Sequence, residues 1–277
     1  MRWISIAAAV IASAITSADV AGVAAPAPLP VADKGELPAV DVELVLAVDV
    51  SYSMDMDELA LQREGYALAI TSTDFLQALK TGPNGKVVVT YFEWAASNDQ
   101  KVIIPWRVVD GPESADAVAA EILKAPLRRA SRTSISGAIN FAVPLFEQSG
   151  YRGLRRVIDI SGDGPNNNGI PVTVARDAAL EKGIVINGLP IMLKEPSYST
   201  MDIENLDFYY EDCVIGGAGS FVVPIKTREK FKEAIRTKLT LEVAGREPEP
   251  QAIPVAASAP RITCMIGEQL WQDRWGR

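Results

Sequence analysis

Apolar and polar positions between residues 40 and 245 follow two patterns in turn, one typical of buried strands and one typical of helices. The run VDVELVLAVDV is almost continuously apolar, which indicates a strand covered on both faces. Residues 57–79 instead carry apolar side chains at helical spacing. The runs KVVVTYFEW and QKVIIPW, joined by the polar turn AASND, predict a β-hairpin.

The same alternation continues downstream. Helices are predicted for ESADAVAAEILK, ISGAINFAVPLF, VTVARDAALEKG and REKFKEAIRTKLTLEV, and strands for RRVIDIS, IVINGLPI and AGSFVVPI. Strands that are connected through helices usually pair in parallel. The order therefore predicts an α/β fold with a doubly wound, mostly parallel central sheet, one antiparallel edge strand and helices on both faces.

The first residues differ in composition from this region. Arg2 is followed by an almost wholly apolar segment and then by the small residues Thr16 and Ala18. This pattern predicts a signal peptide over residues 1–18, and thus an exported protein, periplasmic or secreted, that has no membrane span after cleavage. Residues 19–39 are rich in Ala and Pro and are expected to form a linker.

The chain ends with a second biased segment. Residues 246–277 begin as a Pro-rich tail and end with a short segment that carries Trp271 and Trp275. Large indole side chains favour contact with protein over exposure, so we expect this last segment to dock on the domain of residues 40–245. Cys213 and Cys264 allow one intramolecular disulfide, which an exported protein can keep. Two free thiols, or an intermolecular bridge, are the alternative.

Charge and composition argue against several classes of function. The chain has 27 basic and 35 acidic residues and a net charge of −8, which disfavours binding to nucleic acid. It contains no histidine, so Ser-His-Asp triads and His-based zinc sites are excluded. A metal ion would have to be held by oxygen atoms or by the two cysteines.

Oxygen-bearing side chains follow three of the predicted elements. In doubly wound sheets, ligands bind at the carboxyl ends of the strands. The first strand ends in Asp49, Ser51 and Ser53, and alternate residues of an extended segment point the same way. Thr133 precedes the helix ISGAINFAVPLF, and Asp163 follows the strand RRVIDIS. These five residues are expected to meet at one edge of the sheet.

This arrangement resembles the metal-ion-dependent adhesion site of the von Willebrand factor A (VWA) family. The family pattern is D-x-S-x-S after the first strand, a Thr before a helix, and Asp-Gly after the next strand. Residues Asp49, Ser51, Ser53, Thr133 and Asp163 match its five positions one by one. The resemblance covers about residues 40–243 and is greatest to a branch of exported bacterial members whose function is not established. It implies that the hydroxyls bind the ion directly, while the acids often act through water.

Two carboxylates and three hydroxyls suit a hard divalent cation, Mg²⁺ first and Mn²⁺ or Ca²⁺ as alternatives. Part of the ion's charge stays uncancelled, so the ion is expected to attract an acidic side chain of a protein partner. The prediction is a divalent-cation-dependent module for adhesion or assembly in the bacterial cell envelope, without catalytic residues.

Further residues border the predicted site. Glu93 ends the second strand and is expected at the same rim, and Asn166 and Asn167 follow Asp163, so these three are predicted to contact the partner. Asp159 is interpreted as structural, because a carboxylate deeper in a strand needs a partner.

Each site residue taken alone also fits a structural explanation, as a helix cap or as part of a turn. Two other functions are considered for the chain. One is a Mg²⁺-dependent hydrolase of Rossmann-like fold. Phosphatases of the haloacid dehalogenase type place a second Asp where this chain has Ser51, and a hydroxyl there is a poor general acid. The other is a scaffold that does not use metal.

Overall fold

The computed structural model describes residues 37–194, 202–245 and 260–276. The predicted signal peptide of residues 1–18, the predicted linker up to residue 36, and residues 246–259 of the tail lie outside the described residues.

Five strands form one sheet in the order β3-β2-β1-β4-β5. They are β1 (Ala39–Asp49), β2 (Val87–Trp94), β3 (Gln100–Val109), β4 (Arg152–Gly162) and β5 (Ile184–Pro190). Strands β1, β2, β4 and β5 are parallel, and the edge strand β3 pairs antiparallel with β2. The predicted doubly wound sheet with one antiparallel edge strand is confirmed.

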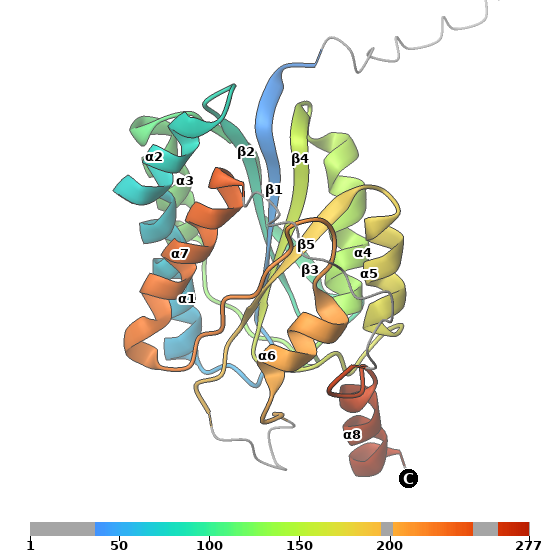
Figure 1. Ribbon diagram of the computed structural model, residues 1–277. Coiled ribbons are helices and arrows are strands. Elements are labelled where there is room, and N and C mark those ends of the chain that lie inside the picture. Colours follow the sequence, from blue (N-terminus) through green and yellow to red (C-terminus); the bar gives the residue numbers. More distant parts are fainter. Residues whose placement is uncertain (1–36, 195–201, 246–259, 277) are drawn as a thin grey trace, which may run out of the picture. The chain divides into compact units, whose positions relative to one another are not determined.

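Helices cover both faces of the sheet (Figure 1). One face carries α1 (Met56–Ile70), α2 (Thr73–Thr81), α3 (Pro112–Lys124) and α7 (Phe231–Ala244). The other carries α4 (Ile135–Leu145) and α5 (Val172–Leu180). The short α6 (Leu206–Tyr209) continues into a π-helical turn, η2 (Tyr210–Val214), and the last helix is α8 (Ile266–Trp275). Two 3-10 turns, η1 (Phe146–Gln148) and η3 (Arg228–Lys230), complete the elements.

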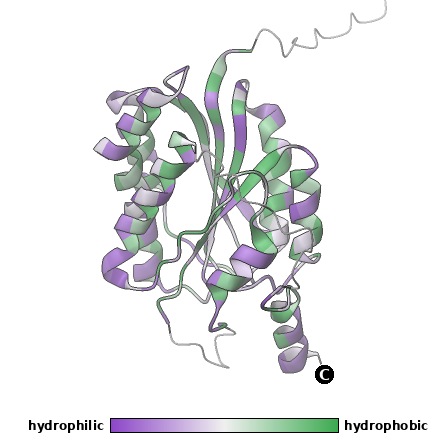
Figure 2. Cartoon of the chain, in the orientation of Figure 1, coloured by the Kyte–Doolittle hydropathy of each residue, from purple (hydrophilic) through white to green (hydrophobic). Residues whose placement is uncertain are grey.

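The alternation of side chains along β1 explains the two helical layers. Leu44, Leu46 and Val48 pack with residues of α1 and α7, while Val45 and Ala47 pack with residues of α4 and α5. Because both faces are covered, every residue of β1 after Ala39 is buried, as the apolar run predicts. Figure 2 shows the same distribution, with strands that are mostly apolar and polar residues on the outer sides of the helices.

Two sequence-based predictions need correction. The helical segment 57–79 is two helices, because Ser72 caps α2 and its hydroxyl accepts a hydrogen bond from the Phe75 amide at 3.2 Å. The run AGSFVVPI is not a strand: it makes isolated bridges to β5 at Val222 and just beyond it at Ile225. Pro224 between them has no amide hydrogen to donate, which prevents a continuous ladder. Within the described residues, no helix has both the length and the apolar character that a membrane crossing requires.

Candidate cation site

The carboxyl end of β1 holds the first predicted ligand in the interior. Asp49 is fully buried, and its Oδ1 accepts a hydrogen bond from the Ser51 amide at 2.7 Å. Gln62 of α1 donates to the Asp49 carbonyl at 3.1 Å and fixes the backbone there. This turn directs the next two hydroxyls toward β4.

A chain of hydroxyl contacts joins this loop to the end of β4. The Oγ atoms of Ser51 and Ser53 are 2.8 Å apart, and the Ser53 hydroxyl donates to Asp163 Oδ1 at 2.6 Å. A hydroxyl has one hydrogen and two lone pairs, so a serine that donates to a carboxylate still has an oxygen lone pair for a cation. The structure thus brings together the side chains of Ser51, Ser53 and Asp163.

The loop that carries Thr133 is hydrogen-bonded to both of the other loops. The Ala130 amide donates to the Val50 carbonyl at 2.9 Å. The Thr133 amide donates to Asn167 Oδ1 at 3.0 Å, and the Asn167 amide donates to the Thr133 carbonyl at 2.8 Å. The Thr133 hydroxyl faces Gly164, where a Cβ atom would lie 3.9 Å from it. All five predicted ligands therefore lie at the meeting point of three loops.

Helix capping does not account for these residues. The N-cap of α1 is Asp55, whose side chain accepts from the Glu58 amide, and the N-cap of α4 is Ser134, whose hydroxyl accepts from the Gly137 amide. Asp49 does close a local turn, but it uses only one of its two carboxylate oxygens to do so.

One carboxylate oxygen of each of the two acids makes no hydrogen bond. Asp49 Oδ2 and Asp163 Oδ2 are buried and have no hydrogen-bond partner. Burial raises the pKa of Asp49, and the nearby charge of Asp163 raises it further. Burial also raises the pKa of Asp163, to about 7, although the Ser53 hydrogen bond opposes this. Such oxygens fit a divalent cation, which would supply the missing positive charge.

The donor set is unusual in its shortage of acids. In the described part of the chain, no three Asp, Glu, His or Cys side chains are grouped as a metal site would require. A cation here would have to take most of its protein ligands from Ser51, Ser53 and Thr133, and its other ligands from water. Mg²⁺ commonly keeps several waters, so a sparse set of acids is compatible with it.

Gly162 and Tyr210 pack against Asp49 on the interior side of the site. A Cβ atom at Gly162 would lie 2.9 Å from both Asp49 Oδ2 and the Tyr210 hydroxyl oxygen, so only glycine fits between them. Tyr210 belongs to η2 and is fully buried. Sequence reasoning missed it, because nothing in the spacing of residues 206–214 indicates that they pack under the first strand.

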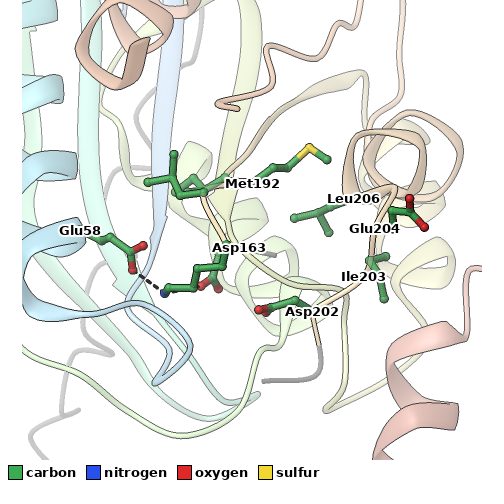
Figure 3. Close-up of a pocket in the computed structure, with 10 residues that line it drawn as sticks. Glu58, Asp163, Met192, Asp202, Ile203, Glu204 and Leu206 are labelled. Carbon is green, nitrogen blue, oxygen red and sulfur yellow. Dashed lines mark hydrogen bonds and ion pairs between the residues drawn. The ribbon is translucent and has the colours of Figure 1, made fainter. Parts of the chain in front are cut away.

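A cavity of about 190 Å³ opens beside Asp163. Figure 3 shows Asp163 between Glu58 on one side and Asp202 on the other. Lys194 Nζ pairs with Glu58 Oε2 at 2.6 Å, donates to the Ser53 carbonyl, and lies 4.0 Å from Asp163 Oδ2. Lys194 was also missed, although its position just after β5 places it at the same edge of the sheet.

The predicted partner contacts at Glu93 and Asn166 require correction. Glu93 is 1% exposed, and its two carboxylate oxygens pair with Arg63 and Arg128. Asn166 is fully buried and accepts a hydrogen bond from the Ser136 amide at 2.9 Å. Both residues hold loops together rather than offer atoms to a partner. Asn167 is partly exposed, and a partner contact there stays a prediction.

Asp159, which is interpreted as structural from the sequence, forms a buried ion pair. Lys238 of α7 contacts Asp159 Oδ1 at 2.8 Å and Glu242 Oε1 at 2.5 Å, and all three side chains are fully buried. This cluster fastens α7 to β4 and takes no part in the site.

The two cysteines are bonded to each other. Cys213 of η2 and Cys264 form a disulfide with a Cα–Cα distance of 5.4 Å. It ties the segment before α8 to the segment that lies behind the site.

The fold of the chain is that of VWA domains. The pilus adhesin SpaC from Lactobacillus rhamnosus GG superposes with a TM-score of 0.55 at 11% identity, over 74% of this chain and 31% of the adhesin. Proximal thread matrix protein 1 from the mussel byssus has a TM-score of 0.53 at 12% identity, over 75% and 49% of the two chains. A von Willebrand factor type A protein from Catenulispora acidiphila has a TM-score of 0.52 at 15% identity, over 74% and 43%. The chain thus spans about half, or less, of the length of these proteins.

Residues 39–247 match the family described as "Protein of unknown function (DUF1194)", and the chain belongs to this family. No curated protein matches it in sequence.

Proposed function

We propose that the protein is a divalent-cation-dependent protein-binding module, used for adhesion or assembly in the bacterial cell envelope. The ion, Mg²⁺ first and Mn²⁺ or Ca²⁺ as alternatives, bridges the module to an acidic side chain of the partner. Ser51, Ser53 and Thr133 hold the ion directly, and Asp49 and Asp163 balance its charge.

One observation carries this proposal. Two buried carboxylates with unpartnered oxygens lie beside three hydroxyls at the carboxyl end of a parallel sheet. A buried carboxylate is costly to ionise, and a chain that keeps two of them at one point is expected to gain stability when it binds a cation there. Water or a carboxylate from outside would supply the ion's remaining ligands.

The similar structures support a binding role over catalysis. One is a pilus adhesin, and one crystal of the mussel protein has a zinc-occupied metal-ion-dependent adhesion site. Location in the envelope rests on the predicted signal peptide and is consistent with the disulfide, because oxidising compartments preserve such bonds.

The test is thermal unfolding of the purified protein with EDTA or with Mg²⁺. Binding to the folded state alone raises stability by RT ln(1 + [L]/Kd), about 2.7 kcal/mol at a hundredfold excess over Kd. We expect Mg²⁺ or Mn²⁺ to raise the melting temperature of the wild type by several degrees. Asp49→Ala should fold and lose that rise.

The matched control is Asp116→Ala, which removes an exposed carboxylate on α3 and should keep the full rise. An unchanged melting temperature of the wild type at millimolar Mg²⁺, Mn²⁺ and Ca²⁺ would remove the cation from the proposal and favour a metal-free scaffold.

A further inference from the structure

The C-terminal helix α8 contacts two of the loops that form the candidate cation site. It lies beyond the carboxyl ends of the strands, next to the loop that follows β4 (Figure 1). The disulfide at Cys264 anchors the chain two residues before α8 begins. Arg261 adds ion pairs to Glu211 at 2.5 Å and Asp212 at 2.8 Å.

The first contact is with the loop of Asp163. Asn166 Nδ2 donates to Glu268 Oε1 at 2.7 Å. Gly267 packs so closely on this loop that a Cβ atom there would lie 2.1 Å from the Asn166 carbonyl oxygen. Asn166 in turn binds the Ser136 amide of α4, and the neighbouring Asn167 binds Thr133. Glu268 therefore holds the residue on which the spacing of the two loops depends.

The second contact is with the loop of Thr133. Arg132 has a φ of 75°, and among the described residues it is the one non-glycine with a positive φ. Side chains rarely adopt this conformation, and such residues occur where surrounding contacts enforce it. The Arg132 guanidinium lies 3.4 Å above the centre of the Trp271 ring. The indole of α8 thus holds the backbone that leads directly into a predicted ligand.

The anchor of α8 is also part of the site. Cys213 is fully buried in η2, three residues after Tyr210, which lies beside Asp49. The hydroxyl of Tyr209 accepts a hydrogen bond from the Asn166 amide at 3.1 Å. One short segment therefore contacts the back of the site, the loop after Asp163 and, through the disulfide, the last helix.

From these contacts we infer that Glu268 and Trp271 are positioning residues of the cation site, and that the Cys213–Cys264 disulfide keeps them in place. The inference rests on the proposed function. Groups that orient metal ligands through hydrogen bonds commonly change metal affinity by about 10- to 100-fold when they are removed. The C-terminal helix then contributes to cation affinity by holding the two loops in place, and not by supplying a ligand.

The experiment is titration of the full, oxidised protein with Mn²⁺, followed by calorimetry or by the electron paramagnetic resonance signal of free Mn²⁺. Glu268→Ala and Trp271→Ala should each weaken Mn²⁺ binding by about tenfold. Glu268→Gln keeps a carbonyl oxygen for Asn166, and Trp271→Phe keeps a ring under Arg132. Both should bind within about twofold of the wild type, a rescue that general destabilisation would not give.

Two variants on exposed positions of α8, Gln269→Ala and Gln272→Ala, serve as controls and should bind as the wild type does. The double variant Cys213→Ala/Cys264→Ala should show the weakening of the alanine variants. Equal Mn²⁺ affinity in the wild type, Glu268→Ala and Trp271→Ala would overturn the inference and leave the proposed function standing. Absence of Mn²⁺ binding by the wild type itself would overturn both.

Discussion

Strand β4 carries Asp159 in the interior and leads, four residues later, into Asp163 at its end, and both carboxylates are buried. Asp159 faces a second buried acid, Glu242, and Lys238 lies against both. Asp163 lies beside a second buried acid, Asp49, and among the described residues no Lys or Arg forms an ion pair with Asp49. The nearest lysine to Asp163, Lys194, is 4.0 Å away and pairs with Glu58.

Burial opposes ionisation of the acids in both regions. Burial raises the pKa of Asp159 to about 6 although Lys238 opposes it, and raises that of Asp163 to about 7. Burial would lower the pKa of Lys238, but its two acidic neighbours outweigh this and raise it. The two pairs of buried acids therefore differ in their cation: Lys238 of the chain pairs with Asp159 and Glu242, and we propose that an ion from solution pairs with Asp163 and Asp49.

The largest effect is expected when the internal cation is removed. Lys238→Met leaves Asp159 and Glu242 buried without a counter-ion, and breaking a buried pair in this way costs about 3–5 kcal/mol. Urea unfolding should show this loss with EDTA and with Mg²⁺ alike, because the cluster does not belong to the site.

Lys232→Met is the matched control, because this lysine of the same helix forms an exposed pair with Glu64. Such pairs contribute about 0–1 kcal/mol. If Lys238→Met lowers the free energy of unfolding by less than about 1 kcal/mol, Lys238 is not the counter-ion that the buried acids require.

At the candidate cation site, removal of one charge should raise the free energy of unfolding instead of lowering it. Asp163→Asn keeps an oxygen for the Ser53 hydroxyl and removes a buried charge. In EDTA at pH 8, we expect its free energy of unfolding to exceed that of the wild type by about 1–3 kcal/mol, because a pKa raised from about 4 to 7 opposes the ionised form. Stabilisation by Mg²⁺ should be lost in the same variant.

Asp159→Asn provides the comparison on the same strand. It also removes a charge that burial disfavours, but it takes one of the two anions from Lys238, so any gain in stability should be smaller than that of Asp163→Asn. If Asp159→Asn stabilises the metal-free protein as much as Asp163→Asn does, the two regions do not differ as proposed.

The pH dependence of stability is expected to depend on the metal. The folded-state pKa of Asp163, about 7, lies above the unfolded value of about 4, so the folded chain binds the extra proton between them. The associated stability is present below pH 4 and is lost as pH rises to about 7; Asp159, with a pKa of about 6, adds a loss of the same sign. Urea unfolding at pH 5 and pH 8 should show this loss in EDTA and a smaller one in saturating Mg²⁺. An equal loss in both solutions would argue against a cation at Asp163.

The smallest expected effect concerns Lys194. Its ammonium lies close enough to Asp163 to repel a cation there. Two elementary charges against one, several ångströms apart in a water-like medium, interact by about 1 kcal/mol. Lys194→Met should therefore tighten Mg²⁺ binding about fivefold in calorimetry, and Lys194→Arg should leave it unchanged. Weaker binding by Lys194→Met would mean that this lysine supports the site through its contact with Ser53.

The strands and helices that the sequence predicts correctly are those with long periodic patterns, such as the apolar run of β1. The strand predicted for AGSFVVPI was wrong, because these residues form only single bridges beside β5 and Pro224 interrupts them. The segment from Leu206 to Val214 was missed because α6 is only four residues long and η2 is an irregular turn.

The five predicted ligands are near in space because the carboxyl ends of parallel strands meet at one edge of the sheet, which the order of elements determines. The roles of Glu93 and Asn166 could not be predicted, because they depend on Arg63, Arg128 and Ser136 from other elements. The contact of α8 with Asn166 could not be predicted either, and the sequence left the pairing of the two cysteines open.

The most direct measurement is a crystal of the protein grown or soaked with Mn²⁺ and its anomalous difference map. We expect one peak among Ser51, Ser53 and Thr133, at about 2 Å from their hydroxyl oxygens, with water or a carboxylate from outside completing the octahedron. No peak there, with Asp163 still hydrogen-bonded to Ser53 alone, would contradict cation binding at this site.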